Sequence, residues 1–164
     1  MDNTHYISTE LLSLETLEEI ISHGKQLTLS EEATANIQKC RMYLDKKMAS
    51  QPEAIYGINT GFGALCNVKI SNENLSKLQE NLVKSHACGI GEEAPLSVVK
   101  LMLLLKIQSL SYGHSGIQLQ TVERLIELYN NDVLPVIYTQ VFFVASGDLV
   151  PLAHLSLPLL GEGD

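Results

Sequence analysis

The feature that most constrains this chain is an apolar stretch between Pro95 and Tyr112. It contains Val98, Val99, Leu101, Met102, Leu103, Leu104, Leu105, Ile107 and Leu110. On a helix these residues would cover nearly every face, and a helix that is apolar all round is normally buried. We therefore expect this stretch to form a core helix, buried all round, with other helices packed against it.

Apolar residues at helical spacing predict further helices on both sides of this stretch. We expect them at Ser13 to Gly24, Ser30 to about Ser50, Ser71 to His86, Ile117 to Asn131, and from about Leu149 onward. Serines stand at the first three starts. Ser13 and Ser71 are expected to cap their helices, because a side-chain oxygen can accept a backbone N–H. Glu31 and Glu32, directly after Ser30, suit the positive end of a helix. Ser146 or Asp148 could cap the last helix. The pattern predicts a mainly α fold with long loops and little β.

Composition limits the partners of the chain. Its 164 residues suit one domain. With 11 Lys and Arg against 19 Asp and Glu the formal net charge is −8, which disfavours nucleic acid and anionic membranes as partners. Prolines interrupt the weakly charged segment from Val133 to Gly161, so it is a poor membrane span. Only 18% of residues are charged, which suggests that a partner subunit, or chain outside these residues, covers part of the surface.

The cysteines favour reduced thiols. Cys40, Cys66 and Cys88 form no C-x-x-C pair and have no nearby histidines at zinc spacing. We expect no metal site and a cytoplasmic location, since the first residues also lack the pattern of a secretory signal.

Four short segments carry residues that core packing does not require. They are the glycine-rich loop Tyr56 to Gly63, the pair Ser85-His86, His114 between two small residues, and Ala145-Ser146-Gly147-Asp148. The glycine-rich loop lacks the Lys-Ser/Thr of a phosphate-binding loop and does not match G-x-G-x-x-G. Taken singly, each segment also fits an ordinary turn, helix end or cap.

Taken together and in order, these segments resemble a known family. The matching stretches are YGINTGFG (56–63), LQENL (78–82), SHACGIG (85–91) and ASGDLVPLAH (145–154). They resemble the aromatic amino-acid ammonia-lyases, and within that family the histidine ammonia-lyases. The resemblance implies the helical N-terminal portion of that fold. We expect residues 1–54 to form N-terminal helices and residues 55–164 to hold active-site loops and core helices, with 1–164 as one portion of a longer chain.

The resemblance also implies a cofactor made from the chain itself. In the family, the glycine nitrogen of Ala-Ser-Gly attacks the alanine carbonyl, and loss of two waters leaves a methylidene-imidazolone (MIO) electrophile. The corresponding residues here are Ala145, Ser146 and Gly147, with Asp148 assisting the dehydration. Glycine suits this closure because it lacks a Cβ. No external cofactor is expected.

The remaining site residues follow from the same resemblance. Tyr56 corresponds to the base that removes the β-proton of the substrate, which would require its pKa to fall from about 10. His86 falls where histidine lyases place a histidine against the substrate imidazole, and we assign Ser85, Asn59 and Gly63 to substrate binding as well. The expected reaction converts L-histidine to trans-urocanate in a homotetramer.

One departure from the family leaves alternatives open. Directly before Ala145 the family reads Gly-Ser-Val/Leu-Gly, whereas this chain reads Val141-Phe142-Phe143-Val144. β-Branched residues do not readily adopt backbone angles that glycine permits, so cyclisation is in question. The alternatives are a phenylalanine or tyrosine ammonia-lyase, an aminomutase, or an inactive helical interaction module. The family's further active-site residues lie beyond this stretch, so we expect residues 1–164 alone to show no turnover.

Overall fold

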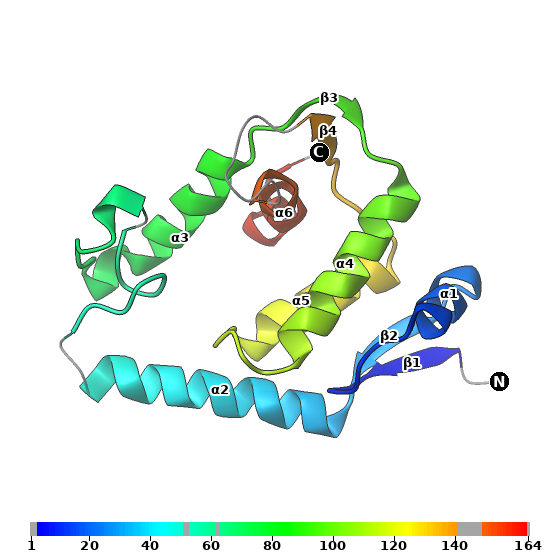
Figure 1. The fold of residues 1–164 in the computed structure, drawn as a ribbon, viewed down its shortest axis with the longest axis horizontal. Helices are drawn as coiled ribbons and strands as arrows, with labels where there is room; N and C mark the ends of the chain where they lie inside the picture. Colours follow the sequence, from blue (N-terminus) through cyan, green and yellow to red (C-terminus); the bar gives the residue numbers. More distant parts are fainter. Residues whose placement is uncertain (1–2, 51–52, 62, 141–148, 164) are drawn as a thin grey trace.

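The computed structural model describes residues 3–50, 53–61, 63–140 and 149–163. Helices dominate this part of the chain, which confirms the predicted mainly α fold (Figure 1). They are α1 (Leu14–Ser22), α2 (Glu31–Ser50), α3 (Asn72–His86), α4 (Leu96–Ser111), α5 (Leu119–Asn130) and α6 (Leu149–Ser156). Two short 3-10 helices, η1 (Gly63–Leu65) and η2 (Leu157–Leu160), follow the glycine-rich loop and α6.

The helix starts depend on local hydrogen bonds to serine. Ser13 Oγ accepts the Thr16 N–H at 3.2 Å, which confirms the cap predicted there, and Ser30 Oγ accepts the Ala33 N–H at 3.1 Å. At Ser71 the predicted N-cap position is confirmed, but a side-chain cap bond is not formed. Ser71 stands directly before α3, and its Oγ instead accepts Asn74 Nδ2 at 2.9 Å.

Two small sheets join segments far apart in the chain. Strand β1 (Thr4–Ile7) pairs in parallel with β2 (Gln26–Leu29), and β3 (Ile90–Glu93) pairs antiparallel with β4 (Tyr138–Gln140). Asn130, at the end of α5, contacts β2 as a further strand would. Its Oδ1 accepts the Leu27 N–H at 2.8 Å and its Nδ2 donates to the Leu27 carbonyl at 2.9 Å.

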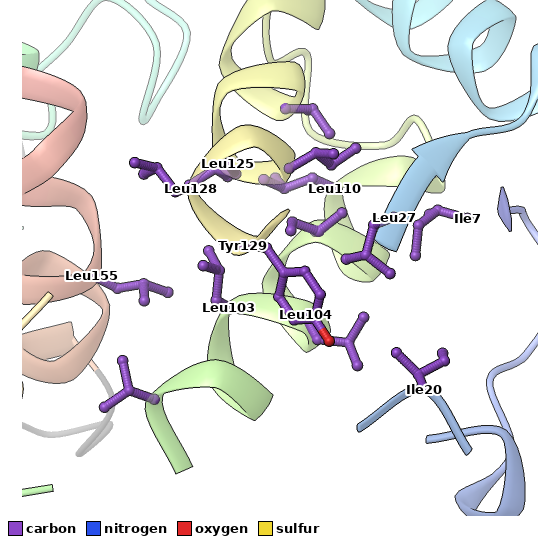
Figure 2. Close-up of a cluster of buried hydrophobic side chains, with 14 of the residues drawn as sticks. Ile7, Ile20, Leu27, Leu103, Leu104, Leu110, Leu125, Leu128, Tyr129 and Leu155 are labelled. Atoms are coloured by element: carbon purple, nitrogen blue, oxygen red, sulfur yellow. The ribbon is translucent and has the colours of Figure 1, made fainter. Parts of the chain in front are cut away.

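One apolar cluster joins α4 and α5 to the first sheet. Leu103, Leu104 and Ile107 of α4 lie in it, with Ile7 of β1 and Leu27 of β2 (Figure 2). It also includes Leu155 of α6, so α6 is anchored to the core. Within the described residues, α3 contributes no side chain to this cluster, and it packs instead against α6.

The prediction that α4 is buried all round is wrong. Leu96, Val98 and Leu105 are exposed, whereas Leu104 is fully buried. In this chain the helix packs on one side against α5 and α2, and its opposite face meets solvent. Among the described residues, no helix is long and apolar enough to cross a membrane.

Two adjacent leucines of α4 test this packing. Leu104→Ala removes a side chain that is 0% exposed and should lower the free energy of unfolding by about 2–5 kcal/mol, because it leaves a cavity. Leu105→Ala is the matched control, since Leu105 is 44% exposed, and should cost less than about 1 kcal/mol. Urea unfolding followed by circular dichroism measures both. Equal losses would contradict the one-sided burial of α4.

Candidate active site

The loop that carries Tyr56 is more ordered than its glycine content predicts. Its two arms meet where Ile70 N donates to the Asn59 carbonyl at 2.8 Å and Gly61 N donates to the Val68 carbonyl at 3.1 Å. Thr60 and Lys69 form an isolated antiparallel bridge between these bonds. The loop therefore has the form of a short irregular hairpin and lies beside the N-terminal half of α3 (Figure 1).

Asn59 closes a tight turn around Tyr56. Its side chain is buried, and its Oδ1 accepts the Ile55 N–H at 2.6 Å. The Asn59 N–H also donates to the Ile55 carbonyl at 3.1 Å. Gly57 within the turn has φ of +77°, a left-handed conformation that side chains disfavour. Tyr56 is 63% exposed, so the turn holds this tyrosine at the surface of the chain.

His86 lies at the C-terminal end of α3, as predicted. Its Nδ1 lies 2.8 Å from the Leu82 carbonyl. Because a carbonyl oxygen can only accept, Nδ1 carries a proton, and Nε2 of the neutral ring is an acceptor. Ser85 Oγ lies 3.2 Å from the same Nδ1 and donates to the Leu82 carbonyl at 3.0 Å. Ser85 therefore lies where it can help to orient the ring.

An ion pair and helix packing fix the end of α3. Lys84 forms ion pairs with Glu80 on its own helix and with Glu162 after η2. Hydrogen bonds to Glu162 and then to Glu80 raise the pKa of the Lys84 ammonium. These contacts join the helix that carries His86 to the segment that follows α6.

The predicted MIO residues Ala145, Ser146, Gly147 and Asp148 lie outside the described residues, as does the preceding stretch Val141–Val144. The elements on either side are described. β4 ends at Gln140 and pairs with β3, and α6 begins at Leu149 and packs against α3. Both described ends of this stretch therefore belong to elements that contact α3 or the strand that follows it.

The structure places Tyr56 and His86 on different structural elements. Tyr56 belongs to the loop before α3, whereas His86 is the last residue of this helix of 15 residues. Such a helix is about 22 Å long. His114 is exposed between α4 and α5, away from both segments in the chain. Among the described residues, no group of three His, Cys, Asp or Glu side chains is arranged to hold a metal.

His154 of α6 is a buried polar residue to which the sequence motifs alone assign no role. Its Nε2 accepts the N–H of Gly89 at 3.0 Å. Gly89 lies three residues after His86 in the sequence. The position of His154 inside ASGDLVPLAH was the available signal, but the bond could not be anticipated because its donor is a backbone N–H. Burial lowers the pKa of the His154 imidazole below its ordinary value of 6.5.

Comparison with known proteins identifies the family. The family model described as aromatic amino acid lyase matches residues 12–164. The chain therefore belongs to the aromatic amino acid lyase family, as its motifs predict.

Individual relatives refine this similarity. A histidine ammonia-lyase of Legionella pneumophila (strain Paris) is 49% identical over 153 residues, which is 93% of this chain and 30% of that protein. The crystal structure of histidine ammonia-lyase from Trypanosoma cruzi is 34% identical with a TM-score of 0.84, over 98% of this chain and 31% of that one. The ergothionase of Treponema denticola is 25% identical with a TM-score of 0.90, over 98% and 32%. The chain thus spans about 30% of the length of its curated relatives.

The turn around Tyr56 can be tested through Asn59. Asn59→Ala leaves the Ile55 N–H without its acceptor, so we expect the local opening free energy to fall by about 1–3 kcal/mol. Hydrogen exchange of residues 53–61 measures this change. Asn67→Ala is the control, since Asn67 is an exposed asparagine of the same loop. Unchanged exchange in Asn59→Ala would show that the side chain does not hold the turn.

Proposed function

We propose that the whole protein to which this chain belongs is an ammonia-lyase that converts L-histidine to trans-urocanate and ammonia. The observation that carries the proposal is the orientation of His86. With its Nδ1 proton directed to the Leu82 carbonyl, the neutral ring offers Nε2 as an acceptor for an N–H of the substrate imidazole. The similarity to histidine ammonia-lyases supports the same substrate.

The chemistry of the residues fits the family cofactor. Ala145, Ser146 and Gly147 provide, in order, a small residue with a carbonyl, a hydroxyl that can leave, and a nitrogen without a neighbouring Cβ. We propose that they form MIO, with Asp148 assisting, and that no external cofactor is needed. When formed, this group would supply an electrophilic carbon for the amine of the substrate. β4 and α6 would hold the two ends of the segment.

Tyr56 is proposed as the base that removes the β-proton. Its phenol must be ionised to accept a proton near neutral pH, so the complete site has to stabilise the phenolate with hydrogen bonds or positive charge. Asn59 supports this role by closing the turn on which Tyr56 stands. The direct contacts with substrate that the sequence predicts for Asn59, Gly63 and Ser85 remain predictions.

The separation of these groups supports an oligomer. Tyr56 is exposed and precedes α3, whereas His86 ends that helix. A closed pocket containing both groups would need further protein surface, and we propose that other copies of the chain supply it in a homotetramer. The expected setting is the cytoplasm, with a small amino acid as the ligand.

The alternatives lead to different products. A phenylalanine or tyrosine ammonia-lyase would release an aryl acrylate, and an aminomutase would release a β-amino acid. An inactive interaction module would leave all three amino acids unchanged, and the stretch Val141 to Val144 is its sequence support. Product analysis with L-histidine, L-phenylalanine and L-tyrosine separates these outcomes.

Intact mass tests the cofactor. Formation of MIO in the whole protein removes two waters, so the measured mass should lie about 36 Da below the mass of the unmodified sequence. Ser146→Ala is the control, because alanine has no hydroxyl to lose, and should show the unmodified mass. A wild-type protein with the full sequence mass would favour the inactive module.

Kinetics test the proposed base. Tyr56→Phe should lower kcat for urocanate formation by about 10²–10⁴-fold with little change in KM, because it removes the base and keeps the ring. Tyr43→Phe is the matched control, since Tyr43 of α2 is 65% exposed and belongs to no proposed site. Urocanate absorbance gives the rate. A Tyr56→Phe protein with normal kcat would exclude Tyr56 as the base.

A further inference from the structure

His154 connects the end of the proposed cofactor segment to the residues that follow His86. It lies on α6, which begins directly after Asp148, and it is 7% exposed. Its partner, Gly89, lies in the short link between α3 and β3, and the bond joins residues 65 apart in sequence. We propose that His154 is a positioning residue that sets the place of His86 relative to α6. This inference rests on the proposed lyase function.

Close packing makes the link specific. A Cβ built on Gly89 would lie 3.1 Å from His154 Nε2, 3.3 Å from Tyr138 Cβ and 3.3 Å from Val150 Cγ1. These distances are tighter than most real Cβ contacts, so glycine is the residue that lets the backbone approach the imidazole closely enough to donate its N–H. The need for a glycine here comes from space, not from a left-handed φ.

The imidazole also contacts β4. Its ring meets the Tyr138 ring edge to face, with centroids 5.5 Å apart and an interplanar angle of 76°. Tyr138 begins the strand that ends at Gln140, and Leu149 begins α6. His154 thus belongs to α6, which follows residues 141–148, and contacts β4, which precedes them. It also contacts the link that follows His86.

The next residue anchors this arrangement to the core. Leu155 belongs to the apolar cluster of α4 and α5, whereas α3 reaches that cluster through α6. The contacts from Leu155 to His154 and Gly89 therefore hold the link after His86, in addition to the ion pair of Lys84 with Glu162. A shift in that link would move His86, and small misplacements of groups that orient a substrate reduce turnover strongly.

The link requires a neutral imidazole. Nε2 can accept the Gly89 N–H only when its lone pair is free, so the proton of the neutral ring must sit on Nδ1. The surrounding elements carry further ionisable groups. They include Tyr138 of β4, Glu80, Lys84 and His86 of α3, Cys88 beside Gly89, Glu92 and Glu93 of β3, and Glu162 after η2. Burial lowers the pKa of His154 below 6.5, so the link is intact at neutral pH and is lost as the pH falls from about 6.5 through the folded-state value.

Three variants of the whole protein test the inference. His154→Gln keeps an acceptor near Nε2 but does not titrate, so it should keep most of kcat at neutral pH and retain more of it than wild type in acid. His154→Leu removes the acceptor and should lower kcat by about tenfold or more. Gly89→Ala crowds the imidazole and should lower kcat similarly. His23→Gln is the control, because His23 is an exposed residue at the end of α1.

Hydrogen exchange of residues 86–92 separates this inference from the proposed function. In His154→Leu this segment should exchange faster, whereas His154→Gln should protect it as wild type does. If the wild-type protein makes no urocanate but exchange responds in this way, the lyase proposal fails and the positioning contact stands. Normal kcat, pH profile and exchange in His154→Leu would overturn the inference. If His154→Leu does not fold, the inference is tested by His154→Gln alone. A fall of kcat with decreasing pH that is the same in His154→Gln and wild type would then overturn the inference.

Discussion

The apolar faces of α4 and α5 meet in one cluster, which also takes in Ile7 of β1, Ile20 of α1 and Leu27 of β2 (Figure 2). Removing this much apolar surface from water is the main favourable term in folding. The other elements are placed by their attachment to it. α6 joins the cluster through Leu155, and α3 is held in turn by α6.

The residues proposed for chemistry lie at the edge of this core. Tyr56 stands on a loop closed by its own hydrogen bonds, and His86 stands at the end of α3, whose described side chains lie outside the cluster. Polar groups in such places keep their side chains available for a substrate, while the buried helices supply rigidity. The same arrangement leaves their geometry dependent on a few polar contacts, of which Asn59 to Ile55 and His154 to Gly89 are examples.

Local patterns predicted the six described α-helices and the N-cap positions of Ser13 and Ser71, because helical periodicity and caps depend on neighbouring residues. They did not predict the strands, which are only three or four residues long, and of which only β2 alternates polar and apolar residues. The predicted all-round burial of α4 failed at Leu96, Val98 and Leu105, since composition does not show which face a partner covers. Motifs made His86 a candidate site residue, but its ring orientation depends on the Leu82 carbonyl, and backbone acceptors have no sequence signature.

The side chain of Asn130 has a consequence for solubility. Exposed strand edges have unpaired backbone groups that can recruit strands from other molecules and lead to aggregation. By bonding both the N–H and the carbonyl of Leu27, Asn130 occupies one pair of the backbone groups that β2 would offer to an incoming strand. A single amide at the end of α5 thus disfavours strand pairing at Leu27, where the first sheet meets the helical core.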